Sequence, residues 1–305
     1  MSSERFLADI RGRLDEAGLR ASLLVRDLAT GRELSIDPER PLPAASLAKL
    51  PIALAVLNRV EDGLLDGAHP VTLAAGDPLD GTPGTARFRH PSTIALDDLV
   101  ALALTISDNS AADALLGTLP TGAVSADLEA MRIDGIAVRH GFGELSDTPL
   151  ERFAPDEANL ALTLAIRGST PADGHPVRQL DVARTNVGSA RAWADLLTAI
   201  WLGRGVRPRV AARLREHLRG NVIRHRLAPD FSSDASMWSS KTGTLLNLRH
   251  EIGVVEHADG GRFVVVALSS SSVPATAQSA AEAALGATAR DLHDRLRDDL
   301  PPVRA

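Results

Sequence analysis

The chain has 305 residues, a length that allows one large domain or two lobes sharing a core. Its 44% hydrophobic and 24% charged residues are typical of a soluble globular protein, and its net charge of −6 argues against a nucleic-acid binder, whose contact surface is usually basic. Because cysteine is absent, a disulfide framework, a thiolate metal site and a cysteine nucleophile are all excluded.

The N-terminal stretch MSSERFLADIRGRLDEAG is charged and of helical pattern, and it lacks the apolar run of a signal peptide. No apolar run elsewhere approaches the length of a membrane span. We therefore expect a cytoplasmic protein that acts on neither a membrane nor a nucleic acid, although a chain whose signal had been removed would look the same.

The first part of the chain predicts a helix followed by two strands. Residues 4–18 have apolar residues at helical spacing. Residues 21–36 read as two strands joined by a turn at Thr30 and Gly31. Residues 41–66, PLPAASLAKLPIALAVLNRVEDGLLD, then predict a proline-marked entry into a largely apolar helix that ends in a glycine-rich turn.

The middle of the chain is predominantly helical. Residues 96–117 predict two buried helices interrupted at Ser107, Asp108 and Asn109. Residues 168–187 have the least ordered pattern. Further helical patterns occupy residues 122–131, 155–167, 188–203 and 208–219.

The C-terminal part changes to strand-like patterns in MWSSKTGTL, RHEIGVVEHA and GRFVVVALSS, of which the last two are joined by a hairpin turn at 259–261. A final amphipathic helix covers 275–298. These elements predict an α/β fold of the α+β kind, in which an antiparallel sheet is flanked by the terminal helices and carries an inserted all-helical lobe. We expect residues 1–45 and 205–305 in the sheet lobe, residues 46–204 in the helical lobe, and an active site in the cleft between them.

Lysine usage is unusual, because 31 of the 33 basic residues are arginine and only Lys49 and Lys241 are lysine. An ammonium group, unlike a guanidinium, can have its pKa lowered until it acts as a base. A codon bias that left two lysines by chance explains the count equally well. The positions of the two lysines must therefore decide between chance and function.

Ser46 and Lys49 are three residues apart, which on a helix places a hydroxyl and an amine on the same face. Serine is a weak nucleophile that needs an adjacent base, and a lysine enclosed by Leu47, Leu50 and Ile52 can serve as one. The pair alone is weak evidence, because serine is common enough to meet this spacing by chance.

Ser107, Asp108 and Asn109 lie between two apolar helical runs. In a turn, serine and asparagine two residues apart can point the same way, one to relay a proton and the other to hold a substrate amide. Helix capping is the alternative interpretation, because asparagine and serine are both preferred N-cap residues.

Lys241, Thr242, Gly243 and Thr244 begin a predicted strand. Glycine lets a ligand backbone approach a strand edge, where an extended amide can pair with the strand. The lysine and the two threonines are suited to binding a carboxylate, although an ordinary strand end would also fit.

These three motifs in this order, with both lysines among them, resemble the active-site serine β-lactamases and penicillin-binding proteins, and the class A β-lactamases in particular. The resemblance covers most of the chain. Residues 31–66 resemble the strand, entry loop and nucleophile helix of class A enzymes, and residues 218–244 resemble the approach to their third motif. The absence of tyrosine excludes class C, whose second motif carries one.

The resemblance implies a role for each residue of the first two motifs. Ser46 is the implied acylated nucleophile and Lys49 its general base. Ser107 is the implied proton relay to the leaving group, and Asn109 the contact to the substrate amide.

For the third motif, the resemblance implies that Lys241, Thr242 and Thr244 bind a substrate carboxylate and that Lys241 lowers the pKa of Lys49. The backbone N–H groups of Ser46 and Thr244 are the implied oxyanion hole.

Arg249 lies close to where these enzymes place a carboxylate-binding arginine, and Arg224 and Arg226 are its rivals. The expected partner is therefore a small molecule that has an amide or ester group and a carboxylate.

The chain departs from the class A pattern in the omega-like loop. Residues 150–159 read LERFAPDEAN, which places Ala154 where class A enzymes have the glutamate that activates the deacylating water. Asp156 or Glu157 is a possible substitute base, and the alternative is that both are solvated loop carboxylates. A general base contributes roughly 10²- to 10⁴-fold, so its loss leaves acylation intact and slows hydrolysis.

Three functions stay open from the sequence. The first is a serine hydrolase acting on an amide or ester, including a β-lactam, through a Ser46 acyl-enzyme with weak release. The second is an acyltransferase or cyclase that passes the acyl group to an amine or hydroxyl in small-molecule biosynthesis. The third is a non-catalytic binding protein that retains the cleft. No metal or cofactor is implied, and we interpret His90, His250 and Glu251 as surface or structural residues.

Overall fold

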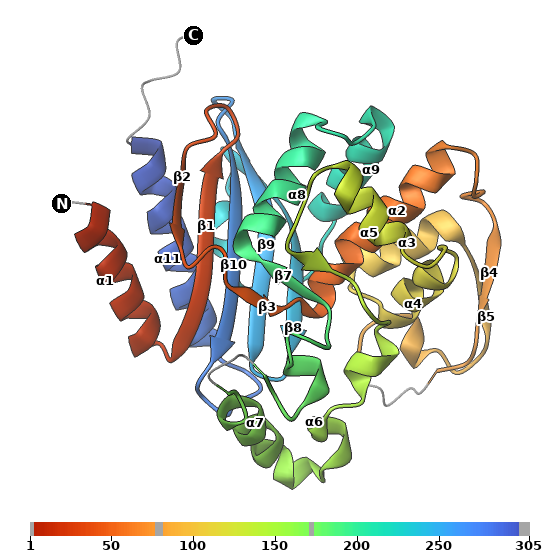
Figure 1. Ribbon diagram of the computed structural model, residues 1–305, viewed down its shortest axis with the longest axis horizontal. Helices are drawn as coiled ribbons and strands as arrows, with labels where there is room; N and C mark the ends of the chain where they lie inside the picture. The colour runs from red at the N-terminus through yellow and green to blue at the C-terminus, as the bar shows by residue number, and fades with distance from the viewer. Residues whose placement is uncertain (1–2, 77–81, 171–173, 299–305) are drawn as a thin grey trace.

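The computed structural model describes residues 3–76, 82–170 and 174–298. Its centre is a five-stranded sheet in the order β2-β1-β10-β9-β8, in which every neighbouring pair is antiparallel (Figure 1). This confirms the predicted fold class. The strands are β1 (Leu19–Asp27), β2 (Glu33–Ile36), β8 (Ser236–Leu245), β9 (Leu248–His257) and β10 (Arg262–Ser271).

The two terminal helices, α1 (Ser3–Glu16) and α11 (Ser279–Asp298), lie together on one face of the sheet (Figure 1). Ile10 of α1 and Leu292 of α11 belong to one apolar cluster with Phe263 of β10. Because these helices are apolar on one face only, burying that face against the sheet fixes their position.

The opposite face of the sheet is covered by α8 (Ala190–Leu202), which packs on β1 and β10. Beyond it lies the helical part of the molecule, built around α2 (Lys49–Glu61). Every residue of α2 from Lys49 to Leu57 is buried, which explains why this helix is apolar all round. Its neighbours are α3 (Leu96–Thr105), α4 (Asn109–Gly117), α5 (Ala123–Ala130) and α9 (Pro208–Arg219).

The predicted break in the helical run at residues 107–109 is confirmed by the end of α3 and the start of α4. The expected helix at 155–167 begins as a 3₁₀ turn, η4 (Pro155–Glu157), and continues as α7 (Ala158–Arg167). Of the segment expected to be irregular, residues 171–173 lie outside the described residues, and η5 (Arg178–Leu180) is a single turn.

Several short elements are absent from the sequence prediction, because two to four residues carry too little pattern and prolines obscure it. A small sheet has the order β3-β7-β6, and β4 pairs with β5 as a separate two-stranded sheet. The elements in question are β3 (Pro41–Pro43), β4 (Pro70–Leu73), β5 (Ser92–Ala95), β6 (Ile136–Ala137), β7 (Val187–Ser189), η1 (Ala45–Ala48), η2 (Thr85–Arg87), η3 (Gly143–Ser146), α6 (Pro149–Arg152) and α10 (Ala228–Phe231).

The lobe boundaries at residues 45 and 205 stay a prediction, and α8, which falls within the helical range, packs on the sheet itself. Among the described helices, none combines the length and the apolar character needed to span a membrane.

Two buried histidines are held in the neutral form. Nδ1 of His250 accepts the N–H of Ser269 at 3.0 Å, so its Nε2–H is the donor to the Pro43 carbonyl at 2.9 Å. Burial lowers the pKa of His250 to about 4. Burial likewise lowers the pKa of His293, which lies between α11 and the sheet, to about 4.

We therefore predict that the free energy of unfolding falls as the pH drops from about 6.5 to about 4. In that window the unfolded chain, with ordinary histidine pKa values near 6.5, binds more protons than the folded chain, at a cost on the order of 3 kcal/mol for His250. Urea denaturation at several pH values measures this slope. His250→Asn should flatten it, whereas the exposed His90→Asn should not. An unchanged slope in His250→Asn would contradict the assignment.

Candidate active site

Ser46 lies in η1, a single 3₁₀ turn that leads directly into α2. The residue before it, Ala45, has φ of +46°, a region that residues with a Cβ rarely adopt. The turn packs on Gly243 of β8, where a Cβ would approach the Ala44 carbonyl and Leu47 Cγ to 3.1 Å. A side chain at position 243 would therefore crowd this turn, so packing is one reason for the glycine. The approach of a ligand backbone to the edge of β8 stays a prediction.

The amine of Lys49 is the centre of the site. Its Nζ lies 3.2 Å from Ser46 Oγ, 2.5 Å from the Ser107 carbonyl, 3.2 Å from Ser107 Oγ and 2.6 Å from Asn109 Oδ1. The first and second motifs are thus brought together on one amine. Ser46 is half-buried and Lys49 is buried, so the hydroxyl faces the accessible side.

The pKa of Lys49 is lowered well below its ordinary value, first by burial and then by the positive charge of Lys241. The negative charges of Asp108 and Asp113 act in the opposite direction and do not offset these effects. The environment therefore makes the neutral amine, which is the form that can accept a proton, more accessible than it is for a lysine in water.

Lys241 on β8 connects the third motif to the second. Its Nζ donates to Ser107 Oγ at 3.0 Å and to the Thr242 carbonyl at 2.9 Å. Burial lowers the pKa of Lys241 to about 7, and Arg226 adds to this effect while Glu251 opposes it. Ser107 Oγ thus lies between both lysines of the chain.

The three residues of the second motif make different contacts. Asp108, which is buried, is the N-cap of α4 and accepts the Ala111 N–H at 3.1 Å. It also accepts the Thr85 N–H at 2.7 Å and the Thr85 hydroxyl at 3.1 Å. Capping therefore belongs to Asp108, which frees Ser107 and Asn109 to contact Lys49. Ser107 itself has φ of +63°, a strained conformation of the kind that collects at functional sites.

A cavity of about 600 Å³ opens on Ser46 between the helical part and the sheet. From the helical part it is lined by Ser46, Ser107 and Asn109. From the sheet side and the start of α11 it is lined by Thr242, Thr244, Arg226, Arg249 and Glu282. Among the described residues, no group of His, Asp or Glu side chains is arranged to hold a metal ion.

Glu282 is a cavity residue that the sequence analysis missed. Its carboxylate pairs with Arg226 at 3.1 Å and with Arg249 at 3.3 Å, and all three side chains are buried. Arg226 also donates to Thr244 Oγ1 at 2.7 Å. Arg224 is excluded as a rival, because it lines a different cavity and donates to Ser232. Nothing in the pattern of the final helix distinguishes Glu282 from its other charged residues.

Phe142 was also missed. Its ring lies 4.6 Å from Lys49 Nζ and is fully buried, so it shields the amine from water. Asp113 holds this position by accepting the N–H groups of Phe142 at 2.5 Å and Gly143 at 2.8 Å. Phe142 lies in a loop far from the three motifs in sequence, so no spacing could have indicated it.

The structure does not bring the possible substitute bases into this cavity. Ala154, Asp156 and Glu157 are exposed, and none of them is among the described residues that line the cavity with Ser46. Glu157 Oε2 instead accepts the N–H of Ala154 at 3.4 Å. These features agree with the interpretation of both carboxylates as solvated loop residues.

His250 and Glu251 are buried structural residues. Glu251 accepts hydrogen bonds from Trp238 Nε1 at 2.8 Å, from Ser240 Oγ at 2.7 Å and from the Leu227 N–H at 2.8 Å. Its carboxylate is therefore committed to holding β8, β9 and the start of α10 together.

Solved structures of similar fold are class A β-lactamases and a penicillin-binding protein. A variant class A β-lactamase of the last common ancestor of Gram-negative bacteria gives a TM-score of 0.77 at 22% identity, covering 97% of this chain and 100% of that one. A mutant of PBP-A in an acyl-enzyme complex with penicillin G gives a TM-score of 0.74 at 19% identity, covering 97% of each chain.

Sequence comparison gives the family. The model described as "Beta-lactamase enzyme family" matches residues 5–296. A Streptomyces cacaoi protein named "Beta-lactamase regulatory protein BlaB" is 51% identical over 310 residues, which cover 98% of this chain and 99% of that protein. The chain belongs to the β-lactamase enzyme family, as the three motifs predicted.

We predict that Asp108→Ala lowers the free energy of unfolding by about 3 kcal/mol, because it leaves three buried donors without their carboxylate. Urea denaturation measures the change. The matched control is Asp98→Ala, which removes an exposed carboxylate from the first turn of α3 and should cost about 0.5 kcal/mol or less. Equal losses in the two variants would show that Asp108 does not anchor the second motif.

Proposed function

We propose that this protein forms an acyl-enzyme at Ser46 with amide or ester substrates, β-lactams included, and releases the acyl group slowly. The observation that carries the proposal is the buried Lys49 amine, which lies 3.2 Å from Ser46 Oγ and has a lowered pKa. Neither Asp156 nor Glu157 lines the cavity beside it. The substrate is a small molecule.

Acylation follows from the hydrogen bonds of Lys49. A neutral amine has two N–H groups, and the two shortest contacts, to the Ser107 carbonyl and Asn109 Oδ1, use both. The remaining lone pair faces Ser46 Oγ and takes its proton as the serine attacks the carbonyl carbon. In this proposal the backbone N–H groups of Ser46 and Thr244 stabilise the developing oxyanion.

The proton then reaches the leaving group through Ser107. Its Oγ lies 3.2 Å from Lys49 Nζ, so Ser107 can give its own proton to the leaving group and take the proton of Lys49 in its place. The hydrogen bond from Lys241 at 3.0 Å holds the Ser107 hydroxyl in position for this transfer. The Nδ2 group of Asn109 stays free for the substrate amide once Oδ1 is bound to Lys49.

A substrate carboxylate would meet Thr242, Thr244, Arg226 and Arg249 in the cavity. Because Glu282 already pairs with both arginines, the substrate carboxylate has to compete with a buried carboxylate of the protein. This supports weaker selection for anionic substrates than two unpaired arginines would give.

Slow release follows from the omega-like loop. With alanine at 154 and exposed carboxylates at 156 and 157, the described part of the loop offers no base beside Ser46. Losing a general base costs roughly 10²- to 10⁴-fold in the step that it serves. An amine or hydroxyl acceptor would replace water in the acyltransferase variant of this proposal.

The second candidate function is regulatory, and it is favoured by the name of the 51% identical relative, a β-lactamase regulatory protein. A protein that is acylated readily and whose acyl-enzyme is hydrolysed slowly remains acylated for a long time. The same site would then serve recognition of an acylating molecule, with the acyl-enzyme as the persistent state.

We predict that intact-protein mass spectrometry after exposure to a penicillin, a cephalosporin and a simple ester detects one stable adduct, and that Ser46→Ala abolishes it. Persistence for many minutes is expected because no base beside Ser46 activates water. Adding an amine such as hydroxylamine distinguishes acyl transfer, since it would shorten the adduct lifetime.

Rapid loss of the adduct in water would contradict slow release, and a longer lifetime in Glu157→Gln would then identify Glu157 as the base. A protein that no acyl donor labels would leave only the binding function.

We predict that the rate of adduct formation rises with pH as Lys49 loses its proton, with a midpoint well below the ordinary lysine pKa. Lys49→Arg keeps a cation that cannot deprotonate, so it should slow labelling by about 10²-fold or more. Labelling reactions that are quenched at a series of times and read by mass spectrometry measure both effects. Labelling of Lys49→Arg at the wild-type rate would show that another group is the base.

A further inference from the structure

In the proposed function, the amine of Lys49 acts as a base in acylation but not in release of the acyl group. It takes the proton of Ser46, and the same neutral amine could take a proton from water and so hydrolyse the acyl-enzyme. The lack of a carboxylate in the omega-like loop does not prevent this reaction. Slow release therefore needs a second feature that keeps water away from Lys49.

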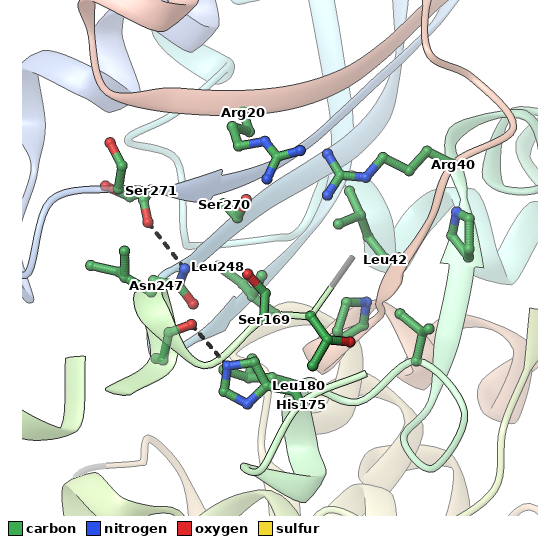
Figure 2. Close-up of a pocket in the computed structure, with 17 residues that line it drawn as sticks. Arg20, Arg40, Leu42, Ser169, His175, Leu180, Asn247, Leu248, Ser270 and Ser271 are labelled. Carbon is green, nitrogen blue, oxygen red and sulfur yellow. Dashed lines mark hydrogen bonds between the residues drawn. The ribbon is translucent and has the colours of Figure 1, made fainter. Parts of the chain in front are cut away.

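The amine of Lys49 is closed to solvent, although the hydroxyl of Ser46 is not. Ser46 lines the cavity of about 600 Å³, whereas Lys49 is 1% exposed and does not line it. A second cavity, of about 410 Å³, lies between β3, the end of α7 and the β8–β9 turn, and Lys49 does not line it either (Figure 2). A substrate can thus reach the hydroxyl, while water in these two cavities does not touch the amine.

Phe142 covers a side of the amine that its hydrogen-bond partners leave open. The ring centroid lies 4.6 Å from Lys49 Nζ, and the ring is fully buried. The polar contacts of Nζ are to Ser46, Ser107 and Asn109. A buried water needs both room and polar partners, and the ring takes up the room with apolar atoms.

The position of Phe142 is fixed from two directions. Asp113 accepts its N–H at 2.5 Å. The buried Asn186 accepts the N–H of His140 at 3.2 Å through Oδ1 and donates to the His140 carbonyl at 3.1 Å through Nδ2. The carbonyl of Asn186 also accepts the N–H of Ala44, the N-cap of η1, at 2.7 Å. The loop that carries Phe142 is therefore tied to the turn that carries the nucleophile.

We propose that Phe142 is a positioning residue for slow release, because it excludes the water that Lys49 would otherwise activate against the acyl-enzyme. This inference rests on the proposed acylation of Ser46. The ester carbon is one bond from Ser46 Oγ, which lies 3.2 Å from Lys49 Nζ. A water held by the amine would therefore lie within attacking distance of that carbon, roughly 3–3.5 Å.

When water is admitted beside Lys49, the reaction is complete hydrolysis and needs no further reactant. The water oxygen bonds to the ester carbon while one of its protons passes to Lys49 Nζ. The bond between that carbon and Ser46 Oγ then breaks, and Oγ takes the proton from Lys49. The acyl group leaves as a carboxylic acid, and both side chains regain their starting forms.

Intact-protein mass spectrometry of the penicillin adduct tests the inference. We expect Phe142→Ala to shorten the adduct lifetime at least about tenfold, because the vacated space beside the amine can hold water. Phe142→Leu keeps an apolar side chain of smaller size, so it should shorten the lifetime less, and it serves as the test if the alanine variant does not fold. The matched control is Phe263→Ala, which removes another buried ring, packed with α1 and α11, and should leave the lifetime unchanged.

The two lysines provide a readout that a purely structural role would not change. Lysine labelled with ¹³C at Cε gives one NMR signal for Lys49 and one for Lys241, because the chain has no other lysine, and Lys49→Arg assigns them. In Phe142→Ala the titration midpoint of Lys49 should move towards the ordinary lysine pKa, because burial is the first cause of its lowering and hydration outweighs the lost contact with the ring face. The rate of adduct loss in this variant should rise with pH across the same midpoint.

The outcomes separate this inference from the proposed function. A wild-type adduct whose lifetime is unchanged in every folded variant of Phe142 overturns the inference and leaves the proposed function standing. Equal shortening in Phe142→Ala and Phe263→Ala also overturns it, because loss of packing anywhere would then be the cause. Faster adduct loss that does not rise with pH overturns it as well, since Lys49 would not be the base. A wild-type protein that forms no adduct overturns both.

Discussion

The site depends on holding the amine of Lys49 in a buried position that lowers its pKa and fixes its direction. Burial and the nearby Lys241 disfavour its charge, and the Ser107 carbonyl and Asn109 Oδ1 hold its N–H groups. Lys49, the turn at residues 107–109 and Lys241 come from three parts of the chain, so they are brought together only when the helical part packs on β8. The packing of η1 on Gly243 and the anchoring of the second motif by Asp108 both stabilise this arrangement of the helical part on β8.

The charges around the amine form a buried series rather than isolated pairs. Lys241 lowers the pKa of Lys49, and Arg226 lowers the pKa of Lys241. Glu282 is the carboxylate at the end of this series of Lys49, Lys241 and Arg226, because it forms an ion pair with Arg226. Because burial of unpaired charge is costly, such a series is stable only where carboxylates compensate it and where one member gives up its proton. The lowered pKa of Lys49 has burial as its first cause and the charge of Lys241 as its second.

The sequence was sufficient for the sheet, the long helices and the meeting of the three motifs, because each has a strong local signal. Ser46 and Lys49 share a turn, and both lysines fall within motifs. The remaining features depend on tertiary placement. Phe142 and Glu282 reach the site from a loop and from the final helix, where no spacing marks them. In the second motif, Asp108 has an anchoring role because it accepts hydrogen bonds from Thr85, which lies far from it in sequence.

The pairing of β1 with β10 also has a consequence for how the protein is made. Leu19 in β1 pairs with Ser271 at the end of β10, the central strand, so β1 has no β10 partner until almost the whole polypeptide has left the ribosome. Pairings between residues so distant in sequence slow folding, because the loop must close before the contact stabilises it. Until then Ser46, Lys49 and Lys241 lack the enclosure that the folded chain gives them, so the proposed acylation would begin only after the last strands have paired.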